Sequence, residues 1–308
     1  MKKISGIVTS DPLNNQEIGA TINFQTKYFY PILEKGIKPV SNWGVFSGVV
    51  LNMSFINSAS GKYIVDGSAV IIAPGVALCA THVINTYLNK IKSGKLTVNC
   101  FGISENDVII WRVKKLTPIN NTDFTILSIE LASKIPSNKI FYQASITTRF
   151  PKLNEQILLC GFKPKNKLNK YSKGIGSTVE QELYVSQGKV TATFPQRRDS
   201  VINPWPCFEI NSLAHGGMSG GPVFDKHGKL IGLVCSSMAF QDNEGITYVS
   251  HIWPSLATEF EAVWPVGLRK SKTDLMSLKD CFIDKREAVT VTRDSEKNIN
   301  LAAYEKWE

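Results

Sequence analysis

The sequence lacks the long apolar runs that mark membrane-spanning and secreted proteins. No uninterrupted apolar stretch reaches the roughly 18 residues that a transmembrane helix needs. The start, MKKISGIVTSDPLNNQEIG, holds two lysines but no apolar run of the length of a secretory signal. Glycine and proline are not in excess and charged residues make up 20% of the chain, which excludes disordered and fibrous classes. We therefore expect a soluble, cytoplasmic, globular protein.

The six cysteines include no C-x-x-C pair of the kind that binds zinc or performs redox chemistry. Cys79, Cys160 and Cys235 each lie in an apolar, strand-like context, where a free thiol behaves as a small hydrophobe. Since no secretory signal is apparent, reduced structural thiols are favoured over disulfides. No pattern in the sequence calls for a metal or an organic cofactor.

Positive charge exceeds negative charge, with a formal net charge of +9. Such an excess permits an acidic partner such as nucleic acid, but it also serves solubility. The densest basic cluster, KPKNKLNKYSK at 163–173, contains one aromatic residue, Tyr171, and no arginine. Because surfaces that clamp phosphates or read bases usually recruit arginine and stacking aromatics, this stretch is interpreted as a solvated loop. No nucleic acid partner is expected.

Two sets of short β-rich runs, separated by turn residues, occupy most of the chain. The first set, from about 46 to 130, comprises GVVLNMSFI, KYIVDGSAVII, VALCATHVI, KLTVNCFGI, DVIIWRVKKL and FTILSIEL. The second comprises QILLCGF, LYVSQGKVTATF, PCFEIN, GPVFDKHGKLIGLVCSS and GITYVSHI. Few helices would separate these runs, which favours an all-β pair of small barrels over a parallel α/β sheet.

The boundaries between these sets predict four parts: an N-terminal extension over 1–45, a first β-barrel over 46–140, a second over 141–255, and a C-terminal helix and tail over 256–308. The tetrapeptide Asp225–Gly228 indicates a hairpin turn, and Gly232 inside an apolar run indicates a bulge or a close backbone approach. SHIWPSLATEFEAVW places apolar residues at helical spacing after Ser250, a suitable N-cap, so a helix is expected to end the domain.

Three segments contain residues suited to chemistry. In HGGMSGGPVF, glycines flank Ser219, so backbone amides and a substrate carbonyl could approach its hydroxyl, although an ordinary tight turn has the same composition. In VALCATHVI, His82 ends a buried strand, where it serves either as a general base at a cleft or as a core histidine. In NNTDFTILSIEL, Asp123 leads into an apolar run; orienting an imidazole would explain its burial, and a turn residue is the alternative.

Together, and in the order His82, Asp123, Ser219, the three segments resemble the trypsin and chymotrypsin superfamily, especially its bacterial trypsin-like and Deg-type members. The family's pieces T/A-A-H, D-apolar-A-apolar-L and G-x-S-G-G-P read ATH, TDFTIL and GMSGGP in this chain, over about 46–255. The resemblance implies two six-stranded antiparallel β-barrels, with a serine endopeptidase site between them. In that site, His82 would take the proton of Ser219, Asp123 would orient His82, and the amides of Gly217 and Ser219 would form the oxyanion hole.

Three positions depart from the family. Met218 stands where many secreted members carry the aspartate that pairs with a newly cut N-terminus, so activation by such a cut is not expected. Val83 replaces the cysteine that usually follows the catalytic histidine, which removes a disulfide. Leu213 stands where trypsins carry an acid, which favours an apolar substrate side chain of small to medium size. The substrate-binding residues expected from the resemblance are Leu213, His215, Ser237 and Gly245.

The remaining candidates receive structural interpretations. His227 is expected in the hairpin turn and His251 near a helix start, while Asp66 and Asp107 are alternative orienting acids that lack the matching apolar run.

Two other functions stay open: a catalytically silent binding module on the same fold, and a basic two-barrel protein that binds nucleic acid. For the peptidase, the expected partners are a protein or peptide substrate and a regulatory protein, with no membrane partner. Because a cytoplasmic peptidase must be restrained, its activity is expected to be gated by a partner or by the terminal extensions.

Overall fold

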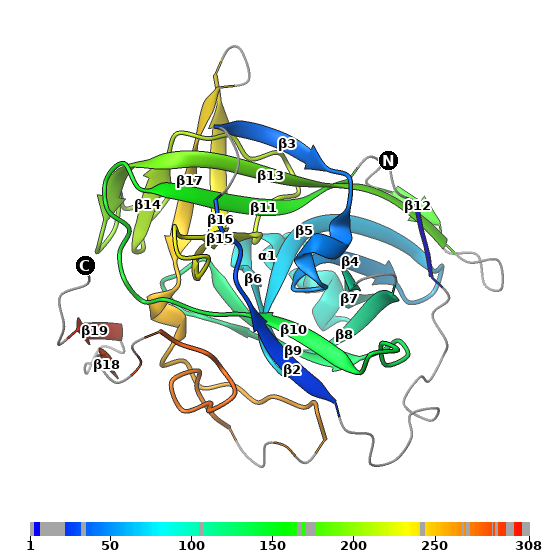
Figure 1. Cartoon of the computed structure of the whole chain (residues 1–308). Coiled ribbons are helices and arrows are strands. Elements are labelled where there is room, and N and C mark those ends of the chain that lie inside the picture. The colour runs from blue at the N-terminus through cyan, green and yellow to red at the C-terminus, as the bar shows by residue number, and fades with distance from the viewer. Residues whose placement is uncertain are drawn as a thin grey trace.

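Two closed barrels of six antiparallel strands dominate the computed structural model (Figure 1). The structure describes residues 3–6, 22–31, 35–104, 107–164, 168–170, 177–240, 244–266, 268, 272–284, 286, 289–293 and 299–303. Each β-rich run expected from the sequence forms or contributes to a strand. The predicted fold class is confirmed.

The first barrel is built from consecutive strands that carry the first set of apolar runs. They are β4 (Val50–Asn57), β5 (Lys62–Ala73), β6 (Val76–Ala80), β7 (Leu96–Ser104), β8 (Asp107–Pro118) and β9 (Phe124–Leu131). They pair in the order β5-β4-β7-β8-β9-β6, and pairing of β5 with β6 closes the barrel. Two short helices, α1 (Thr81–Asn85) and α2 (Leu88–Lys92), follow β6. Closure leaves no free sheet edge within the barrel, and inward side chains such as Trp111 and Phe55 fill it.

The second barrel repeats this architecture with the second set of runs. Its strands are β11 (Gln156–Pro164), β13 (Ser177–Phe194), β14 (Cys207–Ile210), β15 (Pro222–Phe224), β16 (Leu230–Ala239) and β17 (Gly245–His251). Their order is β13-β11-β15-β16-β17-β14, closed by β13 with β14. The predicted turn joins β15 to β16: the Asp225 carboxylate accepts bonds from the amides of His227 and Lys229, and Gly228 has φ +75°. Gly232 is a close approach as expected, since a Cβ there would lie 2.3 Å from the Ser250 carbonyl oxygen.

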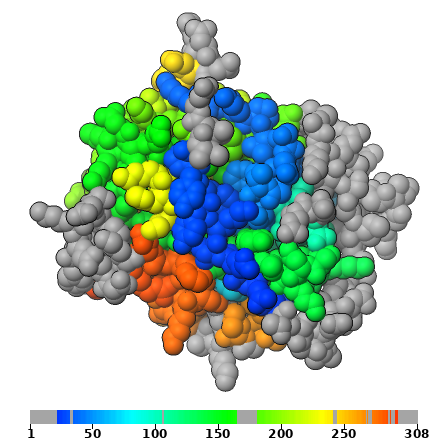
Figure 2. All heavy atoms as spheres, viewed as in Figure 1, coloured from blue at the N-terminus to red at the C-terminus, as the bar shows by residue number. Residues whose placement is uncertain are grey.

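The N-terminal extension joins both halves of the molecule. Strand β2 (Asn23–Lys27) pairs in parallel with β10 (Ile140–Ala144), and β3 (Gly36–Val40) pairs with β13 of the second barrel. A short 3₁₀ helix, η2 (Trp43–Phe46), then leads into the first barrel. Strand β1 (Lys3–Gly6) also pairs with β13. On the face shown in Figure 2, this extension, in blue, runs across the middle of the molecule.

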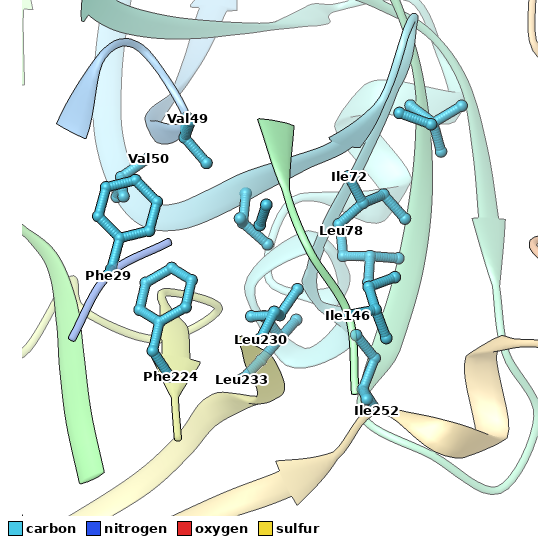
Figure 3. Close-up of a cluster of buried hydrophobic side chains, with 14 of the residues drawn as sticks. Phe29, Val49, Val50, Ile72, Leu78, Ile146, Phe224, Leu230, Leu233 and Ile252 are labelled. Atoms are coloured by element: carbon cyan, nitrogen blue, oxygen red, sulfur yellow. The ribbon is translucent and has the colours of Figure 1, made fainter. Parts of the chain in front are cut away.

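A hydrophobic cluster connects the extension with both barrels (Figure 3). The ring of Phe29, from the extension, lies 4.7 Å from that of Phe224 in the second barrel and 5.3 Å from that of Phe46. Ile72 and Leu78 of the first barrel belong to the same buried cluster. Since burial of apolar area is the main favourable term in folding, this shared core holds the two barrels against each other.

The helix expected after Ser250 is not formed, and this expectation is corrected. Ser250 lies inside β17, and only a single 3₁₀ turn, η4 (Trp253–Ser255), follows. From 258 to 264 the residues alternate between more and less buried, as in an extended chain, with Phe260 and Trp264 inside. The apolar spacing arises because this segment is extended and packs on the first barrel, where Trp264 contacts Trp111 and Phe141. The last described strands, β18 (Val289–Arg293) and β19 (Ile299–Ala303), form a hairpin.

Two further expectations concern the lysine-rich stretch and the cysteines. Most of 163–173 lies outside the described residues; within it, β12 (Leu168–Lys170) pairs with β5 of the first barrel. All six cysteines are buried, and none of them forms a disulfide, as expected. In the described part of the chain, no helix has the length and hydropathy required to cross a membrane.

Candidate active site

The local structure at the end of β6 fixes the position of His82. The chain turns from β6 into the short helix α1, and His82 is the second residue of that helix rather than the last residue of the strand. The first amides of a helix have no partner within it. Asp123 supplies both acceptors: its carbonyl oxygen accepts from Thr81 N at 3.0 Å, and its Oδ1 accepts from His82 N at 3.0 Å. Asp123 therefore holds the backbone of the helix start.

The same carboxylate also holds the imidazole ring. Oδ2 of Asp123 lies 2.8 Å from His82 Nδ1, so the ring is oriented with Nε2 away from the acid. The Asp123 side chain is only 4% exposed, whereas that of His82 is 45% exposed. One edge of the histidine is thus held from the protein interior and the other faces solvent.

The pKa of His82 is set by opposing effects. Burial lowers the pKa, but the hydrogen bond to Asp123 and the negative charges of Asp123 and Asp66 together outweigh it. The pKa of His82 is consequently raised above its usual 6.5. An imidazole that binds a proton this readily is suited to accept one from a neighbouring hydroxyl.

The glycine-rich loop forms a tight turn in front of Ser219. Met218 N donates to the carbonyl oxygen of His215 at 3.0 Å, and Gly217 between them has φ +95°. These are the features of a type II turn, which requires φ above zero at its third residue and therefore favours glycine there. Within the described residues, neither Gly217 N nor Ser219 N donates to a protein acceptor. Two backbone donors are thus left available beside the Ser219 side chain.

The loop that carries Ser219, residues 215–221 and called the Ser219 loop below, lies against the segment that leads to His82. Ser68 N in β5 donates to the Ser219 carbonyl oxygen at 2.8 Å. Gly220 is so close to this segment that an added Cβ would lie 2.7 Å from Ala80 N. The structure therefore brings Ser219 to the end of β6, where His82 and Asp123 are joined. The Ser219 hydroxyl itself makes no hydrogen bond within the described part of the chain, and such contacts are often long before substrate binds.

Met218 anchors the loop from inside the second barrel. Its side chain is fully buried in the core of that barrel, and a Cβ on Gly161 would lie 2.9 Å from its Cα. The sulfur also accepts from His215 N at 3.2 Å. An apolar contact therefore holds the position that carries an ion-pairing aspartate in many secreted members of the resembled family.

Cys235 was not recognised as a site residue from the sequence, although its buried, strand-like context was. Its Sγ belongs to a group with ligand atoms of His82 and Asp123 that all lie within 4.8 Å of one another. Burial, followed by the charge of Asp123 and a hydrogen bond to it, raises the pKa of the thiol, so the neutral form is stabilised. Within this group, His82 and Asp123 are bonded to each other. The signal in the sequence was the position of Cys235 on β16, the second strand after the Ser219 loop.

The expected substrate-binding residues are distributed over two places. Leu213 and Gly245 line a surface cavity of about 250 Å³. Ser237 does not line this cavity but lies next to it: its hydroxyl accepts from Ala214 N and donates to the carbonyl oxygen of Ile246, a cavity residue, each at 3.0 Å. The remaining cavity residues are Lys35, Gly36, Asn211, Ser212, Phe240, Glu244 and Ile246.

His215 packs edge-on against Tyr184, with ring centroids 4.7 Å apart. Burial and the charge of Lys163 lower the pKa of His215. It is therefore a neutral neighbour of the Ser219 loop rather than part of the His82 group.

The alternative acids and histidines lie elsewhere. Asp66 accepts from the Tyr87 hydroxyl at 2.8 Å and Asp107 accepts from Ser137 N, so neither hydrogen-bonds His82. His227 is exposed in its turn. His251 lies at the end of β17 rather than at a helix start; it is fully buried, and burial lowers its pKa to about 4.

Comparisons with known proteins were made by family model and by solved structure. The family model described as "Trypsin-like peptidase domain" matches residues 67–233. Among solved structures, the chain is similar to Deg5, with 17% identity and a TM-score of 0.45 over 67% of this chain and 84% of that one. It is also similar to the HtrA-type protease AlgW, solved with a tripeptide, with 20% identity and a TM-score of 0.43 over 67% of this chain and 56% of AlgW. For the MamO protease domain from Magnetospirillum magneticum, the values are 13% and 0.45, over 68% and 95%. A search of curated proteins gives no match.

Proposed function

Because the chain belongs to the family of trypsin-like peptidase domains, we propose that it is a serine endopeptidase that cleaves proteins through an acyl-enzyme at Ser219. The observation that carries the proposal is the pair of hydrogen bonds between Asp123 and His82: Oδ1 accepts from the backbone amide, and Oδ2 contacts the ring Nδ1. A carboxylate that holds both the backbone and the ring fixes the tautomer a general base needs. The Ser219 loop rests against the same segment.

In the proposed mechanism, His82 Nε2 accepts the Ser219 proton as the hydroxyl oxygen attacks the scissile carbonyl carbon. The proton then passes to the leaving amine as the C–N bond breaks, and water releases the acyl group by the reverse sequence. The Asp123 carboxylate accepts the hydrogen bond from Nδ1 and stabilises the imidazolium that forms between these steps. The raised pKa of His82 supports its role as the base.

The tetrahedral intermediate would be stabilised by the amides of Gly217 and Ser219. Both lack a protein acceptor among the described residues, and the turn that presents them is closed by Met218 N and His215 O. Each such donor is typically worth about 10²–10³ in turnover.

For substrate choice, we propose a small to medium apolar side chain. Leu213 offers no charge to a basic residue, and the hydrogen bond from Ala214 N to Ser237 Oγ holds together two of the segments that would line the pocket. Ser237 and Gly245 would line the walls of this pocket, and His215, in the same loop as Leu213, would touch the substrate. A library of peptide substrates that differ only in the residue before the cleaved bond would test this, and preferential cleavage after lysine or arginine would contradict it.

We also propose that a regulatory partner or the terminal segments control activity. The buried Met218 offers no charge for activation by a new N-terminus, and the N-terminal segment packs on both barrels. The absence of disulfides among the six buried cysteines supports a location in the reducing cytoplasm, where unrestrained proteolysis would be harmful. Cleavage of unfolded casein by the full-length protein, alone and at the rate of a digestive enzyme, would contradict control of this kind.

The proposed function is tested by labelling with a fluorescent fluorophosphonate, which phosphonylates an activated serine and loses fluoride. Wild type should be labelled, and Ser219→Ala and His82→Ala should not. His227→Ala, which removes an exposed histidine of the 225–228 turn, is the matched control and should label as wild type does. If wild type stays unlabelled with and without a candidate partner, the silent binding module becomes the better description.

A further inference from the structure

A buried serine of the first barrel contacts the Ser219 loop of the second. Ser68, in the middle of β5, is fully buried. Its amide donates to the Ser219 carbonyl oxygen at 2.8 Å, and its hydroxyl donates to the Gly217 carbonyl oxygen at 3.0 Å. The hydroxyl also accepts from Phe162 N, in β11, at 2.9 Å. One residue therefore joins β5, β11 and the loop.

These bonds fix the peptide groups next to the two available amides. The Gly217 carbonyl belongs to the peptide whose N–H, on Met218, closes the turn with His215. The Met218 carbonyl accepts from Gly221 N at 2.9 Å, which fixes the direction of the Ser219 N–H. Without the Ser68 hydroxyl, the Gly217 carbonyl and Phe162 N would both lose a buried partner. Gly217 would then be held less firmly, and the neighbouring 216–217 peptide, which presents Gly217 N, would be freer to rotate.

We propose that Ser68 is a positioning residue, which holds the turn at 215–218 in the conformation that leaves Gly217 N and Ser219 N open to the oxyanion. This inference rests on the proposed function. It assigns to the first barrel a part in shaping the proposed oxyanion site of the second, besides supplying His82 and Asp123. The Ser68 hydroxyl would act through the turn that presents the oxyanion donors, and those donors matter mainly in the transition state. Its loss should therefore lower the rate of reaction with little effect on binding.

The test measures kinact and KI for the fluorophosphonate on Ser68→Ala. We expect kinact to fall by about tenfold to a hundredfold, less than for direct loss of an oxyanion donor, with KI within about twofold of wild type. Ser128→Ala is the matched control: Ser128 is also fully buried in the first barrel and donates to a backbone carbonyl, that of Glu261. It should lose similar thermal stability and keep the wild-type kinact.

A second variant keeps the test decisive if Ser68→Ala folds poorly. Ser68→Thr retains the hydroxyl, so its kinact per folded molecule should stay close to wild type. A wild-type kinact in folded Ser68→Ala, or equal losses in the alanine and threonine variants, would overturn the proposal. Both outcomes differ from failure of the proposed function, in which wild type itself is not labelled.

Discussion

Asp123 bonds His82 twice, with Oδ1 to the backbone amide at 3.0 Å and Oδ2 to the ring Nδ1 at 2.8 Å. The first contact serves as the N-cap of α1, since Ala80, at the cap position, has no side-chain oxygen to do so. The second selects the ring tautomer. Helix capping and orientation of the His82 ring therefore depend on one side chain.

Replacement of Asp123 by asparagine separates these two roles. The amide oxygen can still cap α1, but an NH₂ group facing Nδ1 would reverse the tautomer of the ring. We expect fluorophosphonate labelling to slow by about 10³–10⁴ while the melting temperature changes little. Labelling rates and thermal unfolding of the same preparation check this. An unchanged rate would remove Asp123 from the mechanism.

The pH dependence of labelling follows from the pKa of His82. A histidine accepts a proton from serine only when neutral, and its pKa lies above 6.5. The rate should therefore fall as pH decreases, with its midpoint above pH 6.5. Asp66→Asn removes one of the charges that raises this pKa, so it should move the midpoint to lower pH without abolishing labelling. A wild-type midpoint below 6.5 would contradict the role of Asp123 and Asp66 charges.

Neighbouring glycines provide a matched pair for the turn. An alanine at position 217 would have to adopt φ +95°, and its Cβ would lie 2.5 Å from Pro164 Cδ. At position 216, an alanine Cβ would meet no atom within 4 Å. Gly217→Ala should displace the turn and slow labelling by about 10²–10³, the loss expected for one oxyanion donor. Gly216→Ala should label nearly as wild type does. Equal rates for the two variants would show that the turn conformation does not matter.

A buried ion-pair group stabilises the base of the 225–228 turn. Arg149 donates to Asp225 Oδ2 from Nε at 3.0 Å and to Glu155 Oε2 at 2.8 Å, and all three side chains are at most 5% exposed. Arg149→Met would leave two carboxylates buried without their cation. The free energy of unfolding should fall by about 3–5 kcal/mol in urea denaturation.

The matched control removes a surface partner instead. Arg112 pairs with Glu130 at 3.4 Å, with its side chain 37% exposed. Arg112→Met should cost less than about 1 kcal/mol in the same measurement, because exposed ion pairs contribute little. If both variants lost a similar free energy of unfolding, the burial of the ion pairs of Arg149 would not increase their contribution to stability.

Strands were predictable because their signal is local. Runs such as VALCA and FTILSIEL are buried along most of their length, and a continuous apolar run between turn residues is recognisable without knowledge of its partner strands. Reliance on local signals also explains why a helix was wrongly predicted for the segment at 250–264. Its apolar spacing fits a helix locally, but contacts of Trp264 with Trp111 and Phe141, far away in sequence, stabilise an extended chain instead.

The residues of the candidate site also fall into those that a local sequence pattern predicts and those that it does not. His82, Asp123 and Ser219 were accessible because each lies in a short, distinctive segment. Ser68 and Cys235 were not, since a serine or cysteine in an apolar strand is ordinary. Their importance arises from the distance to residues on other strands, such as the 3.0 Å from Ser68 Oγ to the Gly217 carbonyl oxygen. A linear pattern does not contain that distance.

The N-terminal extension, which pairs with strands far along the chain, affects the order in which the molecule folds. Asn23 pairs with Ile140, and Lys38 pairs with Val185, so this segment must wait for strands that leave the ribosome more than 100 residues later. Pairings between such distant parts of a chain carry a large loop-closure cost and form slowly. The final orientation of the two barrels is therefore expected to be a late event, and a chain released before β13 is complete would have its proposed base and orienting acid without the nucleophile.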